Sequence, residues 1–345
     1  MKRPATPPDL TTLRHEAAAS GRLSAILDAV RDIAPNGKYH HWDTLRNYPR
    51  PSGLSHREWW LGVKLRRQGL ARTLPLSDPS GRAFHYLLPD PIPERLHEFD
   101  LQAGGALQMP TAIANPATKE QYYVNSLIEE AVTSSQLEGA STTRRVAADM
   151  LRSRRHPRDR SEQMIHNNYQ AMLHIGEMGP EALTPNAIPN LHRIVTTNAL
   201  DDASAAGRLR SRSEQITVVD PYGEILHEPP PAEQLPQRMA ELCDFANGTS
   251  PAGFVHPVVR SILLHFWLAY DHPFVDGNGR TARALFYWSA RRHGYWLVEY
   301  LSISSILRKA APQYGRAFLD SETDENDLTY FLLHHIRVLD GVWQP

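Results

Sequence analysis

One segment of the chain concentrates the side chains that could do chemistry. It runs from His272 to Arg283 and reads HPFVDGNGRTAR. Gly277 and Gly279 flank Asn278, and both glycines tolerate positive φ, so successive backbone N–H groups can point at one spot. A helix is expected to start directly after this turn, which would add the positive end of its dipole. The turn is therefore a predicted anion-binding site.

The charged residues of the segment indicate which kind of anion. Arg280 and Arg283 lie three positions apart in the first turn of the expected helix, so they share one face. Cations at a helix N-terminus oppose the dipole, so folding alone disfavours them, whereas a polyphosphate held between them would explain both. Asp276 offers a hard oxygen ligand for a Mg²⁺ ion that bridges phosphates. His272 is the side chain here whose ordinary pKa lies near neutrality, as a general base requires.

The alternative interpretation is an ordinary Gly/Asn turn beside a satisfied core histidine. A lone GNG sequence would favour that alternative. It leaves unexplained why a histidine, an aspartate and two arginines fall within the same short segment. We therefore take the segment as a candidate catalytic site that holds a polyphosphate.

Helices are expected to position this segment, because apolar residues recur at spacings of three and four on both sides of it. The expected helix Pro257–Tyr270 ends just before His272, and the expected helix Arg280–His293 carries both arginines. From about residue 118 onward the same periodicity predicts further helices at Glu120–Glu138, Thr142–Ser153, Ser161–Glu177, Pro185–Asn198, Glu233–Ala246, Ile303–Phe318 and Leu328–Leu339.

One stretch, Gln215–His227, breaks the helical pattern. It is rich in residues that favour strands and has a turn at Pro221–Gly223, so we expect a hairpin. A lone two-stranded hairpin is barely stable by itself. Its presence in a helical domain indicates an element that docks a partner, with a decorative loop as the alternative.

The chain is expected to be mainly α, with a small mixed domain at 1–105 and a helical domain at 106–345. Gly104 and Gly105 mark the boundary between them. The prolines near the start predict a loosely ordered segment up to about residue 20. Ser55 and Glu58 form a capping box that opens a helix, and Arg82–Leu88 alternates weakly and is expected to form a strand.

Bulk composition excludes several classes of protein. Hydrophobic residues make up 41% and the formal net charge is −1, so a core is expected and no charge excess points to nucleic acid or a membrane surface. The one cysteine, Cys243, excludes a disulfide framework and a Cys-rich metal site. No segment approaches the roughly 20 apolar residues of a membrane span, and no secretory signal is visible. We therefore expect a cytoplasmic protein.

Several other patterns are expected to be structural. Tyr39–Trp42 reads YHHW, but adjacent histidines do not share a helix face, so packing is preferred over a metal site. Trp59 and Trp60 are expected to pack, and His192 and His265 are expected to be satisfied core histidines. Seven arginines between residues 144 and 160, interrupted by acidic residues, indicate a solvated helix face rather than a nucleic-acid site.

The segment His272–Arg283 resembles the Fic motif, H-P-F-x-D/E-G-N-G-R-x-x-R, and matches it at every defined position. The resemblance covers most of residues 118–345. It implies a Fic-type (fido) helical core with a β-hairpin flap. It also implies transfer of AMP from ATP and Mg²⁺ to a Ser, Thr or Tyr hydroxyl of a protein, with release of pyrophosphate.

The resemblance assigns roles at the predicted anion site (272–283). His272 would take the proton of the acceptor hydroxyl, and Asp276 would hold Mg²⁺. Gly277, Asn278 and Gly279 would cradle the α- and β-phosphates. Arg280 would reach the β-phosphate and Arg283 the γ-phosphate.

The resemblance also implies the surroundings of the site. The flap at 215–228 would pair with an extended target segment by strand addition. Its docking residues would be Ile216, Thr217, Val218 and Val219. Tyr287 and Tyr314 are candidates for the adenine side, although relatives often have paired tyrosines where this chain has Gln313 and Tyr314.

An upstream segment, Ser134–Gly139, reads SSQLEG and resembles the family's inhibitory motif, S/T-x-x-x-E-G/N. Ser134 and Glu138 lie four positions apart on one face of the expected helix at about 120–139, and Gly139 is a natural stop for that helix. The resemblance implies that Glu138 pairs with Arg283 in the place of the γ-phosphate and inhibits the enzyme. The alternative is a solvated glutamate at a helix end.

We therefore expect a protein adenylyltransferase that is inhibited by Glu138 and modifies another protein as well as itself. The same site could instead remove AMP from a modified target, or do both, with Glu138 orienting a water. It could also transfer another group, such as UMP, phosphate or phosphocholine. In a third alternative, of another class, residues 1–105 make the chain a regulator or binding module. A homodimer is compatible with the sequence.

Overall fold

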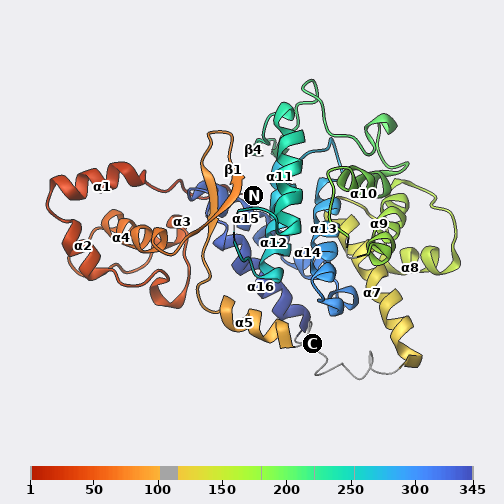
Figure 1. Cartoon of the computed structure of the whole chain (residues 1–345), viewed down its shortest axis with the longest axis horizontal. Helices are drawn as coiled ribbons and strands as arrows, with labels where there is room; N and C mark the ends of the chain where they lie inside the picture. Colours follow the sequence, from red (N-terminus) through yellow and green to blue (C-terminus); the bar gives the residue numbers. More distant parts are fainter. Residues whose placement is uncertain (1, 102–115, 180, 221, 252, 344–345) are drawn as a thin grey trace.

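The computed structural model describes residues 2–101, 116–179, 181–220, 222–251 and 253–343. Most elements are helices, and the two sheets have two strands each. Figure 1 shows a group of N-terminal helices projecting from one end of a larger helical body. The mainly α fold expected from the sequence is confirmed.

The N-terminal group, which we call the N-terminal unit, consists of α1 (Leu10–Ala19), α2 (Leu23–Ala29), α3 (Trp42–Leu45) and α4 (His56–Gln68). Their buried side chains, Trp59 and Trp60 among them, form an apolar core of their own, separate from that of the body. A Cβ on Gly62 would lie 2.7 Å from Val30 Cγ2, so glycine lets α4 pack closely on the end of α2. The unit is thus held together by its own core.

Two local expectations for the N-terminal unit have different outcomes. Ser55 and Glu58 form the predicted capping box at the start of α4. The prediction of a loosely ordered start was wrong, because residues 10–19 form α1. Asp9 caps that helix, and its Oδ1 accepts the N–H of Thr12 at 2.8 Å. The prolines precede the cap, where they do not break helical hydrogen bonds.

A hairpin and a short helix connect the N-terminal unit to the body. Strand β1 (Arg72–Ser77) pairs antiparallel with β2 (Ala83–Tyr86), and α5 (Ile92–Phe99) follows. Their buried side chains, including Leu74 and Phe84, belong to the core of the helical body. The predicted boundary near residue 105 lies outside the described residues. The two apolar cores divide the chain at an earlier point, between α4 and β1.

The body is built around α12 (Pro257–Asp271) and α13 (Asn278–Arg292). Every residue from Val258 to Leu268 is buried, and so is every residue from Arg280 to Ala290. Helices buried on all sides form the centre of a domain. The surrounding helices are α7 (Pro116–Leu137), α8 (Arg144–Ser153), α9 (Arg160–Glu177), α10 (Ala187–Thr196), α11 (Leu235–Asn247), α14 (Ile303–Lys309), α15 (Ala311–Thr323) and α16 (Thr329–Trp343), with short 3₁₀ turns at Pro35–Gly37, Ala203–Ala205, Ala232–Gln234 and Trp296–Tyr300.

The expected helix Ile303–Phe318 was wrong in one respect, because the chain forms two helices there. The break falls at Ala310, whose φ of −125° and ψ of 38° are not helical. Pro312 explains the break, since proline has no N–H to donate and, in a continuous helix, its ring would clash with the carbonyl four residues earlier. It then sits in the first turn of α15, where proline is tolerated.

The hairpin expected at Gln215–His227 is present in a shorter form. Strand β3 (Val218–Val219) pairs antiparallel with β4 (Ile225–His227). Ile216 and Thr217 precede β3 and lie outside the paired strands. No helix in the described parts of the chain is long and apolar enough to cross a membrane.

Replacing Leu264 with alanine tests the central place of α12. Leu264 is fully buried, so we expect a loss of about 2–5 kcal/mol in the free energy of unfolding. The matched control, Leu70→Ala, changes a side chain that is 61% exposed and should cost less than about 0.5 kcal/mol. Urea denaturation followed by circular dichroism measures both, and similar losses for the two variants would contradict this packing.

Candidate functional site

The predicted anion site lies in the turn between α12 and α13. His272 ends α12 in the left-handed conformation, with φ 45° and ψ 56°. Gly277 precedes α13 with φ 81°, and a Cβ there would lie 2.7 Å from Thr196 Cγ2. Both the backbone conformation and the space therefore require glycine at 277. The N-terminus of α13 opens at this turn, as the sequence predicts.

Asn278 fixes the shape of the turn. Its Oδ1 accepts the N–H of Phe274 at 2.9 Å, and its Nδ2 donates to the carbonyl of Phe274 at 2.8 Å. The side chain thus closes the loop on itself and is not free to reach a ligand. We conclude that Asn278 preforms the turn.

His192 of α10 supports the same loop from outside, which the sequence did not reveal. Its ring stacks on Phe274 with centroids 3.7 Å apart and planes within 2°. Its Nδ1 accepts the N–H of Gly207 at 3.0 Å, so Nε2 donates to the carbonyl of Asp276 at 2.8 Å. Burial lowers the pKa of His192 to about 4, so the ring stays neutral. His192 is the satisfied histidine expected, but it also positions the candidate metal ligand.

His272 is held in the form that a base needs. Burial lowers its pKa to about 4, so the imidazole is neutral at neutral pH. Its Nδ1 lies 3.3 Å from the carbonyl of Ala269, so Nδ1 carries the proton and Nε2 keeps a free lone pair. Arg210, from the segment before the flap, donates through Nε to the carbonyl of His272 at 2.8 Å. These two contacts fix the ring of His272 and its backbone carbonyl.

The two arginines of the turn differ in how the protein satisfies them. Arg280 donates to the carbonyl of Val195 at 3.0 Å, whereas its buried Nε and second terminal nitrogen have no hydrogen-bond partner. Asp276 lies 4.0 Å from that nitrogen. Burial lowers the pKa of Arg280 despite the nearby carboxylates of Glu138 and Asp276. Arg280 thus presents positive charge that the described residues only partly neutralise.

Arg283 is fully engaged by the segment that resembles the inhibitory motif. Its guanidinium donates to Ser134 Oγ at 2.8 Å, to the carbonyl of Ser134 at 2.9 Å and to Glu138 Oε1 at 2.8 Å. Although burial opposes it, the Glu138 carboxylate raises the pKa of Arg283. The structure therefore brings Ser134, Glu138 and Arg283 together, and a Cβ at Gly279 would collide with the Glu138 carboxylate.

A pocket opens beside this cluster. His272, Asn278, Gly279 and Arg283 line it together with Glu138. Its other walls come from the flap and α15: Val218, Leu226, His227, Tyr314, Gly315, Phe318, Leu319 and Glu322. The flap therefore forms part of the same pocket wall as α15, and Ala269 and Tyr270 of α12 line the pocket as well.

The two candidates for the adenine side lie in different places. Tyr314 lines the pocket, and its hydroxyl lies 2.7 Å from His265 Nε2. Tyr287 is buried away from the pocket, and its hydroxyl donates to Glu130 of α7 at 2.8 Å. Its hydroxyl also accepts the N–H of Ile303. Tyr287 therefore anchors α7 and α14, and only Tyr314 can touch a molecule in this pocket.

His227 of β4 is a second pocket histidine that sequence reasoning missed. Its Nδ1 lies 2.7 Å from Glu322 Oε2, and its Nε2 lies 2.7 Å from the carbonyl of Tyr270. Although burial opposes the charge, these two acceptors raise the pKa of His227. A lone histidine at the end of a short strand has no local sequence signal, because both of its partners lie far along the chain.

Asp276 is the candidate ligand for Mg²⁺. Its side chain is 43% exposed, and its Oδ2 lies 3.4 Å from the guanidinium of Arg160. Within the described residues, no group of three or more His, Cys, Asp or Glu side chains could hold a metal ion. A single exposed carboxylate fits Mg²⁺ that arrives with phosphates, because such ions keep only one or two protein carboxylates.

Comparison with known proteins agrees with this geometry. Residues 182–290 match the family model of the Fic/DOC family. The protein adenylyltransferase Fic of Nematostella vectensis is 37% identical over 115 residues, which are 33% of this chain and 24% of that protein. The protein adenylyltransferase fic-1 of Caenorhabditis elegans is 32% identical over 108 residues, 31% of this chain and 19% of that protein. The chain thus spans about a quarter or less of these relatives.

Solved structures share the fold at low sequence identity. A Fic family protein from Desulfovibrio desulfuricans G20 has a TM-score of 0.56 and 20% identity, covering 72% of this chain and 70% of that one. A Fic domain containing signaling protein from Bacteroides thetaiotaomicron has a TM-score of 0.54 and 20% identity, covering 72% of this chain and 92% of that one. Residues 182–290 thus match the Fic/DOC family, and the fold is shared with solved Fic proteins.

The pKa values of the two pocket histidines should be shifted in opposite directions from the usual histidine value. We expect His272 to be neutral down to a pKa of about 4, whereas His227 should stay protonated above pH 6.5. Side-chain NMR between pH 4 and 8 measures both, with His272→Ala and His227→Gln spectra for assignment. A His272 resonance that titrates near 6.5 would contradict a half-buried imidazole that is neutral at neutral pH.

Proposed function

We propose that this chain transfers AMP from ATP to a hydroxyl of a protein, and that Glu138 inhibits the reaction. The names of the relatives, protein adenylyltransferases, support the reaction class. The observation that carries the proposal is the buried Arg280 guanidinium at the N-terminus of α13, in which two nitrogens make no hydrogen bond within the described residues. An arginine there is costly unless an anion completes it.

In the proposed mechanism the α- and β-phosphates lie at the N-terminus of α13, against Gly277 and Gly279. Arg280 stabilises the β-phosphate, and Asp276 would hold Mg²⁺, which neutralises phosphate charge when it is bound. The neutral Nε2 of His272 accepts the proton of the acceptor hydroxyl. The hydroxyl oxygen bonds to the α-phosphorus while the bond to the bridging oxygen breaks, and pyrophosphate leaves. Positioning and charge stabilisation supply most of the rate.

Inhibition follows from competition for one guanidinium. Arg283 is the proposed partner of the γ-phosphate, and the Glu138 carboxylate and Ser134 use its donors. A carboxylate at that place repels the γ-phosphate and takes its partner. Productive ATP would therefore require Glu138 to turn away.

The proposed acceptor approaches along the flap. Val219 and Ile225 are 51% and 46% exposed, and Tyr222 at the tip is 89% exposed. Exposed apolar side chains on short strands suit an extended peptide that adds a strand. The target class is therefore a flexible protein segment that bears a hydroxyl, which includes a segment of a second copy of this chain.

Transfer of label from ATP tests the proposal. With Mg²⁺ and α-labelled ATP, Glu138→Gly should take up label at least about tenfold faster than the natural chain. The double variant Glu138→Gly/His272→Ala should lose about 10²–10⁴ of that rate, the usual contribution of a general base. Label from the γ-position alone would instead indicate a kinase-like transfer and refute the proposal.

Affinity for ATP tests the anion site without turnover. In the Glu138→Gly/His272→Ala background, Arg280→Ala should weaken ATP binding by roughly tenfold or more, since a charged hydrogen bond contributes about 1.5–3 kcal/mol. Arg144→Ala, which removes a side chain that is 67% exposed, is the matched control. Isothermal titration calorimetry measures both, and equal affinities would refute the role of Arg280.

Removal of AMP from a modified protein is the second candidate function. The Glu138 carboxylate lines the same pocket as His272, so it could orient a water at the α-phosphorus. Glu138→Gly separates the two candidates, because it should increase AMP transfer but abolish AMP removal from a pre-modified target.

A further inference from the structure

The N-terminal unit meets the body through buried charges rather than through a shared apolar core. Lys64 and Arg67 of α4 are nearly fully buried, and so are Asp324 and Asp327 in the turn between α15 and α16. Lys64 Nζ lies 2.8 Å from Asp324 Oδ1. Tyr39 donates its hydroxyl to Asp327 Oδ2 at 2.5 Å. The apolar cores of the two parts are separate, so this junction depends on matched polar partners.

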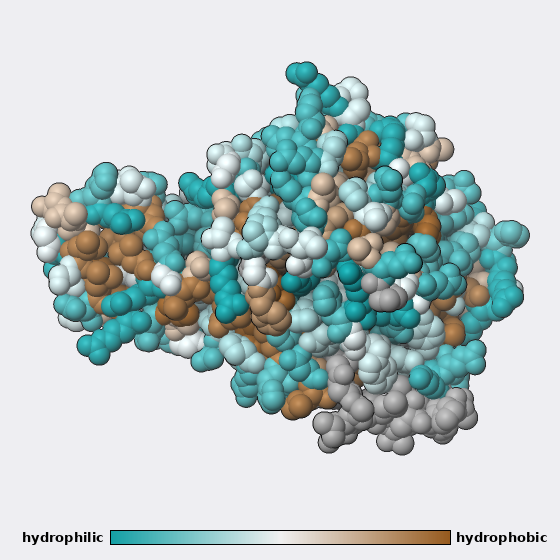
Figure 2. Space-filling view, viewed as in Figure 1, coloured by the Kyte–Doolittle hydropathy of each residue, from teal (hydrophilic) through white to brown (hydrophobic). Residues whose placement is uncertain are grey.

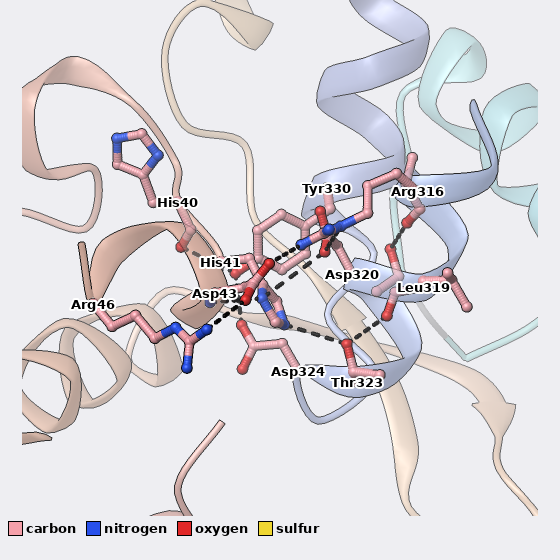
Figure 3. A network of polar contacts seen from close by, with 12 residues as sticks. His40, His41, Asp43, Arg46, Arg316, Leu319, Asp320, Thr323, Asp324 and Tyr330 are labelled. Carbon is pink, nitrogen blue, oxygen red and sulfur yellow. Dashed lines mark hydrogen bonds and ion pairs between the residues drawn. The ribbon is translucent and has the colours of Figure 1, made fainter. Parts of the chain in front are cut away.

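The same unit also makes polar contacts with the outer side of α15, as Figure 3 shows. Arg316 donates to Asp43 Oδ2 at 2.9 Å and to Asp320 Oδ1 at 2.6 Å. The Nε2 of His41 lies 3.2 Å from Thr323 Oγ1. Because the threonine hydroxyl donates to the carbonyl of Leu319, His41 is the donor to Thr323. Burial lowers the pKa of His41, in keeping with this neutral form.

Helix α15 presents its other side to the candidate site. That side of α15 lines the pocket with residues at spacings of one and four, from Tyr314 through Phe318 to Glu322. Glu322 then holds His227 of the flap strand β4 at 2.7 Å. Figures 1 and 2 show the N-terminal unit at one end of the molecule, and in Figure 1 α15 lies between it and α12. A continuous set of contacts thus runs from Asp43 through Arg316 and α15 to the flap.

We propose that the N-terminal unit is a positioning element for the candidate site, in which Asp43 and Tyr39 orient α15 and thereby hold the flap for its protein target. The effect on the protein target rests on the proposed function, whereas the effect on α15 does not. The buried pair Lys64–Asp324 makes the junction specific in geometry, because such a pair fails when one partner is removed. The half-buried pair Asp43–Arg316 extends the junction to α15. A polar interface between two units also allows the units to move relative to each other. The docking of the unit therefore sets how firmly α15 and the flap are held.

Hydrogen–deuterium exchange of the whole chain tests the structural half of this inference. Asp43→Ala and Tyr39→Phe change the N-terminal unit alone, yet we expect exchange in 311–323 and 225–227 to become about three- to tenfold faster. Glu322→Ala, which releases the flap directly, is the positive control. Glu16→Ala removes an exposed ion pair with Arg57 in the same unit and should leave both peptides unchanged.

Exchange that rises only around residues 39–48 in the two junction variants, while α15 and β4 keep their natural rates, would overturn the inference. Urea denaturation accompanies the experiment. A loss of stability in all parts of the chain together would equally overturn it, because the effect would then be unfolding and not repositioning.

Kinetics test the consequence for the target. In the Glu138→Gly background, the acceptor is the chain carrying Glu138→Gly and His272→Ala, and α-labelled ATP is the donor. Asp43→Ala should raise KM for this acceptor by about three- to tenfold and leave kcat within about twofold. An unchanged KM would overturn the role in target positioning. If no variant takes up label, AMP transfer to this chain fails, and the exchange measurement still decides whether the unit positions α15.

Discussion

The structure depends on the burial of two guanidinium groups at the positive end of one helix. Arg280 lies in the first turn of α13 and Arg283 in the second, and the helix is buried on nearly all sides. Charges in such a place are costly unless partners satisfy them. Glu138 and Ser134 satisfy Arg283, which brings the end of α7 onto the site. Two nitrogens of Arg280 make no hydrogen bond within the described residues, so the proposed anion and the Glu138 carboxylate would meet at the same turn.

Segments from distant parts of the chain hold the proposed catalytic loop mainly through backbone carbonyls. His192 donates to the carbonyl of Asp276, Arg210 to that of His272, and His227 to that of Tyr270. Carbonyls fix the path of the backbone without competing for the side chains that do chemistry. In consequence three separate supports position the proposed base, the candidate metal ligand and the flap.

The sequence predicted the loop well because its chemistry is contiguous, and a short motif places His272 and both arginines between two periodic helices. It also predicted that Ser134 and Glu138 share a helix face, and the structure brings them to Arg283. It did not predict the three supporting side chains, since each contacts residues far along the chain and leaves no local pattern. Nor did periodicity detect the break at Ala310, because the apolar spacing continues through it although Pro312 interrupts the hydrogen bonds.

The hydrogen bonds that Asn278 makes with Phe274 have a consequence for the thermodynamics of ligand binding. Because the loop is closed by its own side chain, its backbone is held in one shape before any ligand arrives. A ligand therefore does not spend binding energy on ordering these residues, which otherwise costs about 1–2 kcal/mol for each residue fixed. Binding of a polyphosphate should accordingly be limited by desolvation of the anion and by the movement of one glutamate, and not by the conformational entropy of the loop.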